Sequence, residues 1–257
     1  MAQVDLRRVR RSVAQEARRQ QREERVEEAM HVLQDLIGHL GELSLSRQML
    51  GRIGRALLCE PVELVVPLCP DYGHADGRYT FSGMSGGVSL MLDKYRQLLE
   101  YAAARSGARV TLLYADVEID DHELMASVGV DRAMFSANIA ASVAATQAVV
   151  PDGWRVTTMS EEVLDIRECT AATMERIASQ MRDRITSEVL QNQDICRRID
   201  PRMSVERMRA RLIRTAAQYM ALGAWAHERG ALVLDGTSMV AWYKLTEAPL
   251  LHAKVIF

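Results

Sequence analysis

Short apolar runs alternate with longer helical patterns along the chain. The first run, 64–66, is rich in β-branched residues, and Pro67 and Pro70 are expected to end it because proline cannot donate to a strand ladder. The second, 109–115, is almost continuously apolar, which is typical of a parallel strand covered on both faces. Further short strands are expected at 155–158, 232–234 and 239–243.

The segments between these runs have the three-to-four-residue spacing of amphipathic helices. Residues 1–43 read as helical, and Ser46 is expected to cap a second helix that ends near Leu58. Later helices are expected at 131–147, from Ser160 onward, and from Ser204 to Gly230. Strands alternating with helices predict a Rossmann-like α/β fold with a mostly parallel, doubly wound sheet flanked by helices. We expect an N-terminal helical extension at 1–58 and one Rossmann-like catalytic domain at 59–257.

A long polar stretch follows the first expected strand and precedes a helical pattern. In α/β folds such loops lie at the carboxyl ends of the strands, where ligands bind. We therefore interpret this one as a site-forming loop; the alternative is a surface Ω-loop over one buried cysteine. Ser85, Gly86 and Gly87, just before the helix, are candidates for a backbone phosphate cradle. The other candidate substrate-binding residues of the loop are Asp71, Tyr72, His74, Arg78 and Tyr79.

Cys69 is the candidate nucleophile, because it stands at the end of the first expected strand. A reactive thiolate needs a lowered pKa, and His74 and Arg78 are close enough in sequence to supply positive charge. The alternative is an inert cysteine that packs as a small apolar side chain. Tyr219 and Tyr243 are candidates to point into the same crevice, although buried tyrosines are usually packing residues.

An acidic segment follows the second expected strand. Asp116 directly follows it, with Glu118 close behind, and both are candidate ligands for a substrate amine. Asp120 and Asp121 suit the first turn of a helix, where the dipole favours negative charge.

Two arginine-rich segments are candidate contacts for an RNA phosphate backbone. One is in the N-terminal extension and the other in the last long helix; the alternative for both is a solvated helix face. The net charge is only −2, so the overall charge does not select nucleic acid. The candidate RNA-binding residues are Arg7, Arg8, Arg10, Arg11, Arg207, Arg209, Arg211 and Arg214.

Several classes of protein are disfavoured by missing patterns. The sequence has neither GxGxxG nor GxxxxGK[ST], and its four cysteines and six histidines lack metal-ligand spacing. It therefore predicts no cofactor and no metal. We find no apolar stretch of membrane-spanning length and no secretory signal, so the expectation is a cytoplasmic protein with reduced thiols and no membrane partner.

The order of these motifs resembles that of the aminoacyl-tRNA-dependent cyclodipeptide synthases, whose fold is similar to the catalytic domain of class I aminoacyl-tRNA synthetases. In that family a strand ends in Gly-hydrophobic-Ser, and here Pro67-Leu68-Cys69 stands in its place. The VTLLYAD segment ending at Asp116, the late helix with Tyr219, and Ser238 to Tyr243 resemble the remaining motifs. Gly223 stands where the family has a glutamate that handles the substrate amine.

This resemblance implies an enzyme that condenses aminoacyl groups taken from aminoacyl-tRNA. Cys69 would then accept the aminoacyl group, Tyr219 and Tyr243 would be catalytic, and Ser238 would bind substrate. A second resemblance is to the isonitrile synthases, whose Pro-x-x-Pro is similar to Pro67–Pro70 and which act on a free aromatic amino acid. A third hypothesis is a non-catalytic adaptor on a Rossmann-like core. The sequence leaves amino-acid specificity, product and oligomeric state open.

Overall fold

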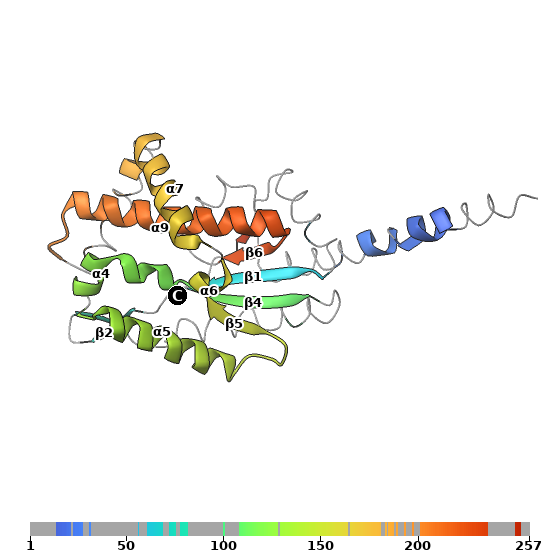
Figure 1. The fold of residues 1–257 in the computed structure, drawn as a ribbon, viewed down its shortest axis with the longest axis horizontal. Helices are drawn as coiled ribbons and strands as arrows, with labels where there is room; N and C mark the ends of the chain where they lie inside the picture. The colour runs from blue at the N-terminus through green and yellow to red at the C-terminus, as the bar shows by residue number, and fades with distance from the viewer. Residues whose placement is uncertain are drawn as a thin grey trace, which may run out of the picture.

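The computed structural model of the chain describes its central part most fully. The described residues are 14–21, 23–27, 31, 56, 61–68, 72–75, 78–81, 100, 108–127, 129–163, 165–180, 183, 185–187, 189, 193, 197, 201–235 and 250–252. Within the N-terminal extension, 14–21 and 23–27 are helical, and Figure 1 shows this helix apart from the sheet.

A parallel sheet forms the centre of the fold. Its strands are β1 (Glu63–Leu68), β4 (Arg109–Tyr114), β5 (Arg155–Thr158), β6 (Leu232–Asp235) and β7 (Leu250–His252). Their order is β5-β4-β1-β6-β7, and every neighbouring pair is parallel. The chain builds outward from β1 to β5, then returns across β1 to add β6 and β7. This is the doubly wound order, so the predicted fold class is confirmed.

Pro67 lies inside β1, which corrects the expectation that it ends the strand. The carbonyls of Val62 and Leu68 accept from Arg109 and Ala115 beside β4, so the even-numbered residues of β1 face β4. Pro67 therefore faces β6, where the pairing with β1 covers only Leu64 and Val65. The missing N–H of this proline breaks no ladder bond.

The polar stretch after β1 contains a β-hairpin that our reading of it as a loop missed. Strands β2 (Tyr72–Ala75) and β3 (Arg78–Phe81) pair antiparallel and form a separate sheet of their own. The two residues between them are Asp76 and Gly77, and Asp-Gly is a strong two-residue hairpin signal.

The described helices cover both faces of the sheet (Figure 1). Helix α5 (Arg132–Gln147) joins β4 to β5 on one face, and α9 (Val205–Arg229) precedes β6 on the other. Asp131 caps α5 at Met134 N–H, Ser204 caps α9 at Arg207 N–H, and Gly230 ends α9 in the left-handed conformation (φ 67°). The other helices that the structure describes in this part of the chain are η1 (Asp116–Asp120), α4 (His122–Ser127), α6 (Met159–Glu162) and α7 (Ile166–Gln180).

The helical region after β5 is broken, where the sequence predicted a continuous helix from Ser160. Thr158 caps the short helix α6 in a capping box with Glu161, and Asp165 then adopts a positive φ of 55° before α7 begins. Val163 and Ile166 on either side of the break are both buried. The break therefore lets both apolar side chains enter the core.

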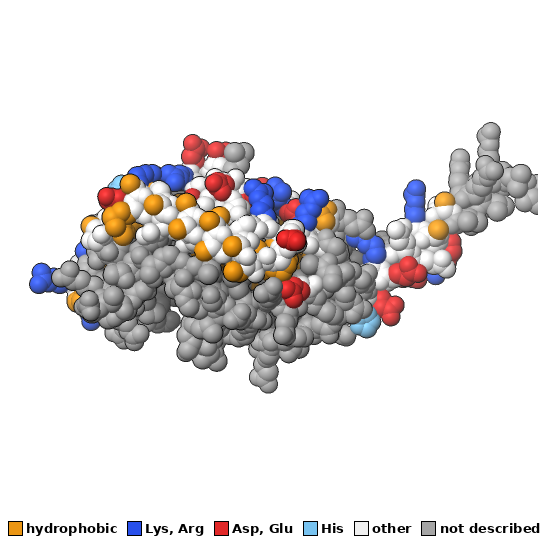
Figure 2. Space-filling model, turned by 90° about the horizontal axis from the view of Figure 1, so that it is seen from below, with side chains coloured by type: hydrophobic (Ala, Val, Ile, Leu, Met, Phe, Trp, Pro, Cys, Tyr) orange, Lys and Arg blue, Asp and Glu red, His pale blue; other side chains and the backbone are white. Residues whose placement is uncertain are grey.

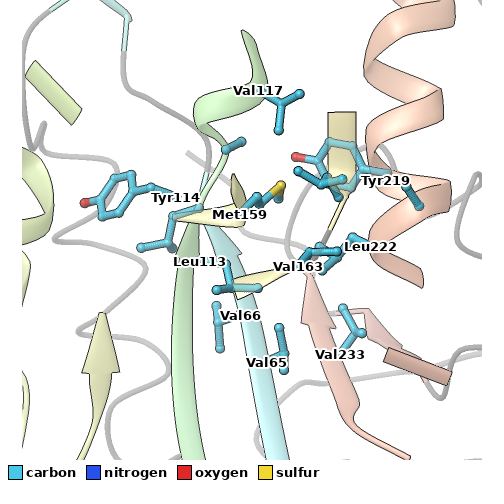
Figure 3. Close-up of a cluster of buried hydrophobic side chains, with 14 of the residues drawn as sticks. Val65, Val66, Leu113, Tyr114, Val117, Met159, Val163, Tyr219, Leu222 and Val233 are labelled. Atoms are coloured by element: carbon cyan, nitrogen blue, oxygen red, sulfur yellow. The ribbon is translucent and has the colours of Figure 1, made fainter. Parts of the chain in front are cut away.

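The core packs against both faces of the central strands. Figure 3 shows Tyr219 and Leu222 of α9 on one side with Met159 and Val163, while Tyr114 points to the other side. There the Tyr114 hydroxyl is 2.8 Å from Thr146 Oγ1 on α5. None of the helices in the described part of the chain has the length and apolarity needed to cross a membrane.

The free edge of β5 is closed by one side chain. Gln147 Nε2 donates to the Trp154 carbonyl (3.2 Å), and Gln147 Oε1 accepts from Val156 N–H (3.0 Å). The carboxamide thus takes the place of a peptide group in a neighbouring strand. Covering an edge in this way protects it from pairing with another chain.

Replacing Gln147 with leucine is expected to lower the free energy of unfolding by about 1–2 kcal/mol, because two part-buried backbone groups lose their partners. Urea denaturation followed by circular dichroism measures the change. Ala145→Leu is the matched control, because Ala145 is an exposed residue of the same helix and its change is expected to stay within about 0.5 kcal/mol. Equal stability of the two variants would contradict this role for Gln147.

Candidate active site at the carboxyl edge of the sheet

The strand order reverses between β1 and β6, and in doubly wound folds ligands bind outside the carboxyl ends of the strands at this point. Cys69 and Asp71 follow β1 directly in the sequence, although both lie outside the described residues. The nucleophilic role expected for Cys69 and the substrate-binding role expected for Asp71 therefore stay predictions. The strand that precedes both residues, β1, is the central strand of the sheet.

Asp116 lies at this edge, half-buried, at the start of η1. Its Oδ1 atom accepts a hydrogen bond from Ser160 N–H at 3.0 Å, which joins the end of β4 to the segment that follows β5. The carboxylate thus has a structural contact on one oxygen.

Asp120 is the centre of a charge cluster at the other end of η1. Its two oxygens lie 3.2 Å from Arg132 Nη2 and 3.6 Å from Arg167 Nη1. The Asp120 side chain is 29% exposed and both arginines are more exposed, so these pairs contribute less than about 1 kcal/mol each. They hold η1 against the first turns of α5 and α7.

Helix α9 extends well past the carboxyl edge. Its 25 residues are about 37 Å long, against about 20 Å for the six residues of β1. Because β6 follows α9 closely and the two run in opposite directions, the N-terminal half of α9 projects beyond the strand ends. At this end, backbone hydrogen bonding and then the Ser204 hydroxyl lower the pKa of Glu206.

Three of the four predicted arginines of α9 share one side of that projecting half. Arg207, Arg211 and Arg214 are four and three residues apart in turn, which places them in one stripe. We call these three the arginine stripe. Arg209 lies on the other side, where its Nη2 atom donates to Thr186 Oγ1 at 3.0 Å. The four arginines therefore do not form a single basic face.

A pocket of about 250 Å³ separates the arginine stripe from the acidic segment after β4. We call it the arginine pocket. Met174 of α7 and Met203 add apolar surface to it. The Nη1 atom of Arg211 is buried and has no hydrogen-bond partner. The pocket's lining residues are Asp120, Asp121, His122, Met174, Met203, Arg207, Ala210, Arg211 and Arg214.

Tyr219 is buried in the middle of α9, 1% exposed, and lies beside Met159 above the sheet (Figure 3). Gly223, one turn later, is also buried and brings no carboxylate to this place. Tyr219 therefore packs in the core, and its catalytic role stays a prediction.

Most of the other predicted site residues are beyond what the structure describes. Asp71, Ser85, Gly86, Gly87, Ser238, Tyr243 and the N-terminal arginines Arg7, Arg8, Arg10 and Arg11 lie outside the described residues, as does Cys69. Tyr72, His74, Arg78 and Tyr79 belong to the hairpin strands, and Glu118 to η1, with only their backbone described. Among the described residues, no three His, Cys, Asp or Glu side chains group to hold a metal ion.

Sequence reasoning missed three residues near this edge. Arg132 and Arg167 hold Asp120, and no sequence pattern connects them because they come from different helices. Gln218 follows Arg211 and Arg214 on the same side of α9; it is 1% exposed, and neither amide atom has a hydrogen-bond partner. The sequence signal that could have found Gln218 is its polar side chain within the mostly apolar segment 216–221.

Comparisons with known proteins give a likeness of fold and none of sequence. No family model matches the sequence, and no curated protein matches it. The fold resembles that of a solved structure, CDPS (cyclodipeptide synthase) from Staphylococcus haemolyticus, with a TM-score of 0.47 and 6% sequence identity. The match covers 80% of this chain and 94% of that chain. The cyclodipeptide synthases are also the family whose motif order this sequence resembles.

Proposed function

We propose that the chain is an enzyme that transfers or condenses an aminoacyl group delivered by aminoacyl-tRNA. The observation that carries this proposal is the lining of the arginine pocket at the carboxyl edge of the sheet. Three arginines line it together with two carboxylates, those of Asp120 and Asp121. An adaptor would be expected to fill this edge with apolar side chains, so the charged lining favours ligand binding.

The two charged walls suit the two ends of an aminoacylated nucleotide. Guanidinium groups bind phosphate through paired N–H donors, and carboxylates bind the free ammonium of the aminoacyl group. At about 250 Å³ the pocket has room for one small group, with the rest of the RNA outside. The buried Nη1 donor of Arg211 is a suitable partner for a phosphate oxygen.

Cys69 is the proposed acyl acceptor because it follows Leu68, the last residue of the central strand β1. Its thiolate would attack the ester carbonyl, forming the C–S bond as the bond to the ribose oxygen breaks. The departing ribose hydroxyl takes up a proton. The amine of a second aminoacyl group then attacks the thioester, forms the amide as it loses a proton to solvent, and releases the thiolate. Neither step changes an oxidation state, so the reaction needs no redox cofactor.

Removing two charges of the arginine stripe tests the RNA contact. The double variant Arg211→Gln with Arg214→Gln is expected to weaken aminoacyl-tRNA retention at least about tenfold, because two phosphate partners are lost. The slope of log affinity against log salt should fall by about 0.7 for each lost contact. Filter binding at several salt concentrations measures both quantities.

The matched control removes two charges elsewhere. Arg176 is exposed on α7, and Arg229 at the far end of α9 lies 3.4 Å from Glu63 and over the Trp225 ring. Arg176→Gln with Arg229→Gln should leave the salt slope nearly unchanged. If the two double variants lower affinity equally, the arginine pocket has no special part in RNA binding.

A further inference from the structure

A second and larger cavity lies along the outer edge of the sheet, between α5 and β5. Its volume is about 550 Å³, within the range of small-molecule sites. We call it the edge groove. It shares no lining residue with the arginine pocket, and η1 lies between the two, giving Asp116 and Ile119 to the groove and Asp120 to the pocket.

The floor of the edge groove is apolar. Phe135, Ile139 and Val156 are 0%, 4% and 8% exposed, and Val143 packs against the same core. Ala140 and Ala144 form the wall on the α5 side. The sequence has no charged residue between Arg132 and Asp152, and Figure 2, seen from the α5 side, shows apolar side chains along the helix. This lining suits an aliphatic or aromatic body.

One end of the groove is polar and rich in carboxylates. Asp116 is held through Oδ1 by Ser160 N–H, and Glu161 through Oε2 by the Thr157 hydroxyl at 2.5 Å. One oxygen of each carboxylate is thus held by a hydrogen bond within the protein. Ser160 also lines the groove, and its hydroxyl oxygen is buried with no hydrogen-bond partner.

These observations identify the kind of ligand. Two carboxylates and a hydroxyl oxygen accept the three N–H bonds of a primary ammonium, and the apolar floor takes a hydrophobic body beside it. Arg167 also lines the groove, while its guanidinium lies 3.6 Å from Asp120. A ligand that also carries a carboxylate would therefore compete with Asp120 for Arg167.

We propose that the edge groove is a binding site for a hydrophobic primary amine of about the size of an aromatic amino acid. Asp116 and Glu161 bind the ammonium, the Ser160 hydroxyl accepts its third hydrogen bond, and Val143 and Ala144 contact the apolar body. The site is separate from the arginine pocket, and its test uses no RNA, so either proposal can fail without the other.

Three probes with the same phenyl body test the site on the full chain by isothermal titration calorimetry. 2-Phenylethylamine and L-phenylalanine carry the ammonium, and 3-phenylpropionate does not. Binding of the amines and no binding of the acid is expected. If L-phenylalanine binds more tightly than 2-phenylethylamine, and Arg167→Gln removes the difference, the natural ligand is a free amino acid. Equal binding indicates an amine without a carboxylate.

Two variants locate the binding, each chosen to keep the fold. Glu161→Gln keeps an acceptor oxygen for the capping box and removes the charge, so it should weaken amine binding by about tenfold or more. Ala140→Phe fills the groove from α5 and should abolish binding. Ala141→Phe is the control, because Ala141 is the next residue, is also exposed and does not line the groove.

Circular dichroism melting curves confirm that each variant is folded before titration. The proposal is overturned if the wild-type chain binds no amine at millimolar concentration, if the acid binds as well as the amines, or if Ala140→Phe and Ala141→Phe bind alike.

Discussion

Replacing Cys69 with alanine is expected to abolish turnover on aminoacyl-tRNA, by more than about a thousandfold, while the chain stays folded. The residue follows β1, which is the central strand and borders the point where the strand order reverses. Without the sulfur no thioester forms, so the first aminoacyl group has no covalent acceptor. Loss of an aminoacyl adduct on the intact protein, seen by mass spectrometry, is the direct readout.

The serine variant separates a chemical role from a packing role. A hydroxyl still accepts an acyl group, so Cys69→Ser should keep part of the activity and form an oxygen ester instead of a thioester. If Cys69 only packs, both variants act through stability alone, by roughly 1–3 kcal/mol.

The chain offers its own control for this experiment. Cys169 is an exposed free cysteine on α7, and Cys169→Ala should retain full activity and the adduct. A Cys69→Ala variant as active as Cys169→Ala would exclude the nucleophile. It would favour the hypothesis of an isonitrile synthase-like enzyme, which needs no enzyme-bound acyl group.

Replacing Phe135 with alanine is expected to lower the free energy of unfolding by about 3–5 kcal/mol. The ring is completely buried in the first turn of α5, where it packs into the core between this helix and the sheet. Alanine leaves a cavity there that the helix cannot easily close, because Asp131 caps its first turn and Gln147 binds β5 at its last. Urea denaturation measures the loss.

Met134→Ala is the matched control for this prediction. Met134 is the preceding residue and is 49% exposed, so its truncation should change stability by no more than about 0.5 kcal/mol. Similar losses for both variants would mean that α5 does not pack through Phe135.

Local patterns in the sequence were enough to predict the strands and helices that neighbouring residues specify. The apolar run 109–115 became β4, 155–158 became β5, and Ser204 and Gly230 cap α9, because a buried strand and a capped helix are each specified by neighbouring residues. Strand-helix alternation then implied the doubly wound parallel sheet. The pairing of β2 with β3 also has a local signal, the Asp-Gly sequence between the two strands.

The contacts between charged residues, in contrast, depend on how the helices pack around the sheet. Asp116 and Asp120 are four residues apart, yet one lines the edge groove and the other the arginine pocket, because η1 passes between the two cavities. Arg209 faces Thr186, away from Arg211, since residues two apart on a helix point in nearly opposite directions. Arg132 and Arg167 reach Asp120 from two separate helices, and Gln147 reaches the edge of β5 only after α5 has folded back along it. Such contacts depend on how helices pack around the sheet, which local spacing along the chain does not specify.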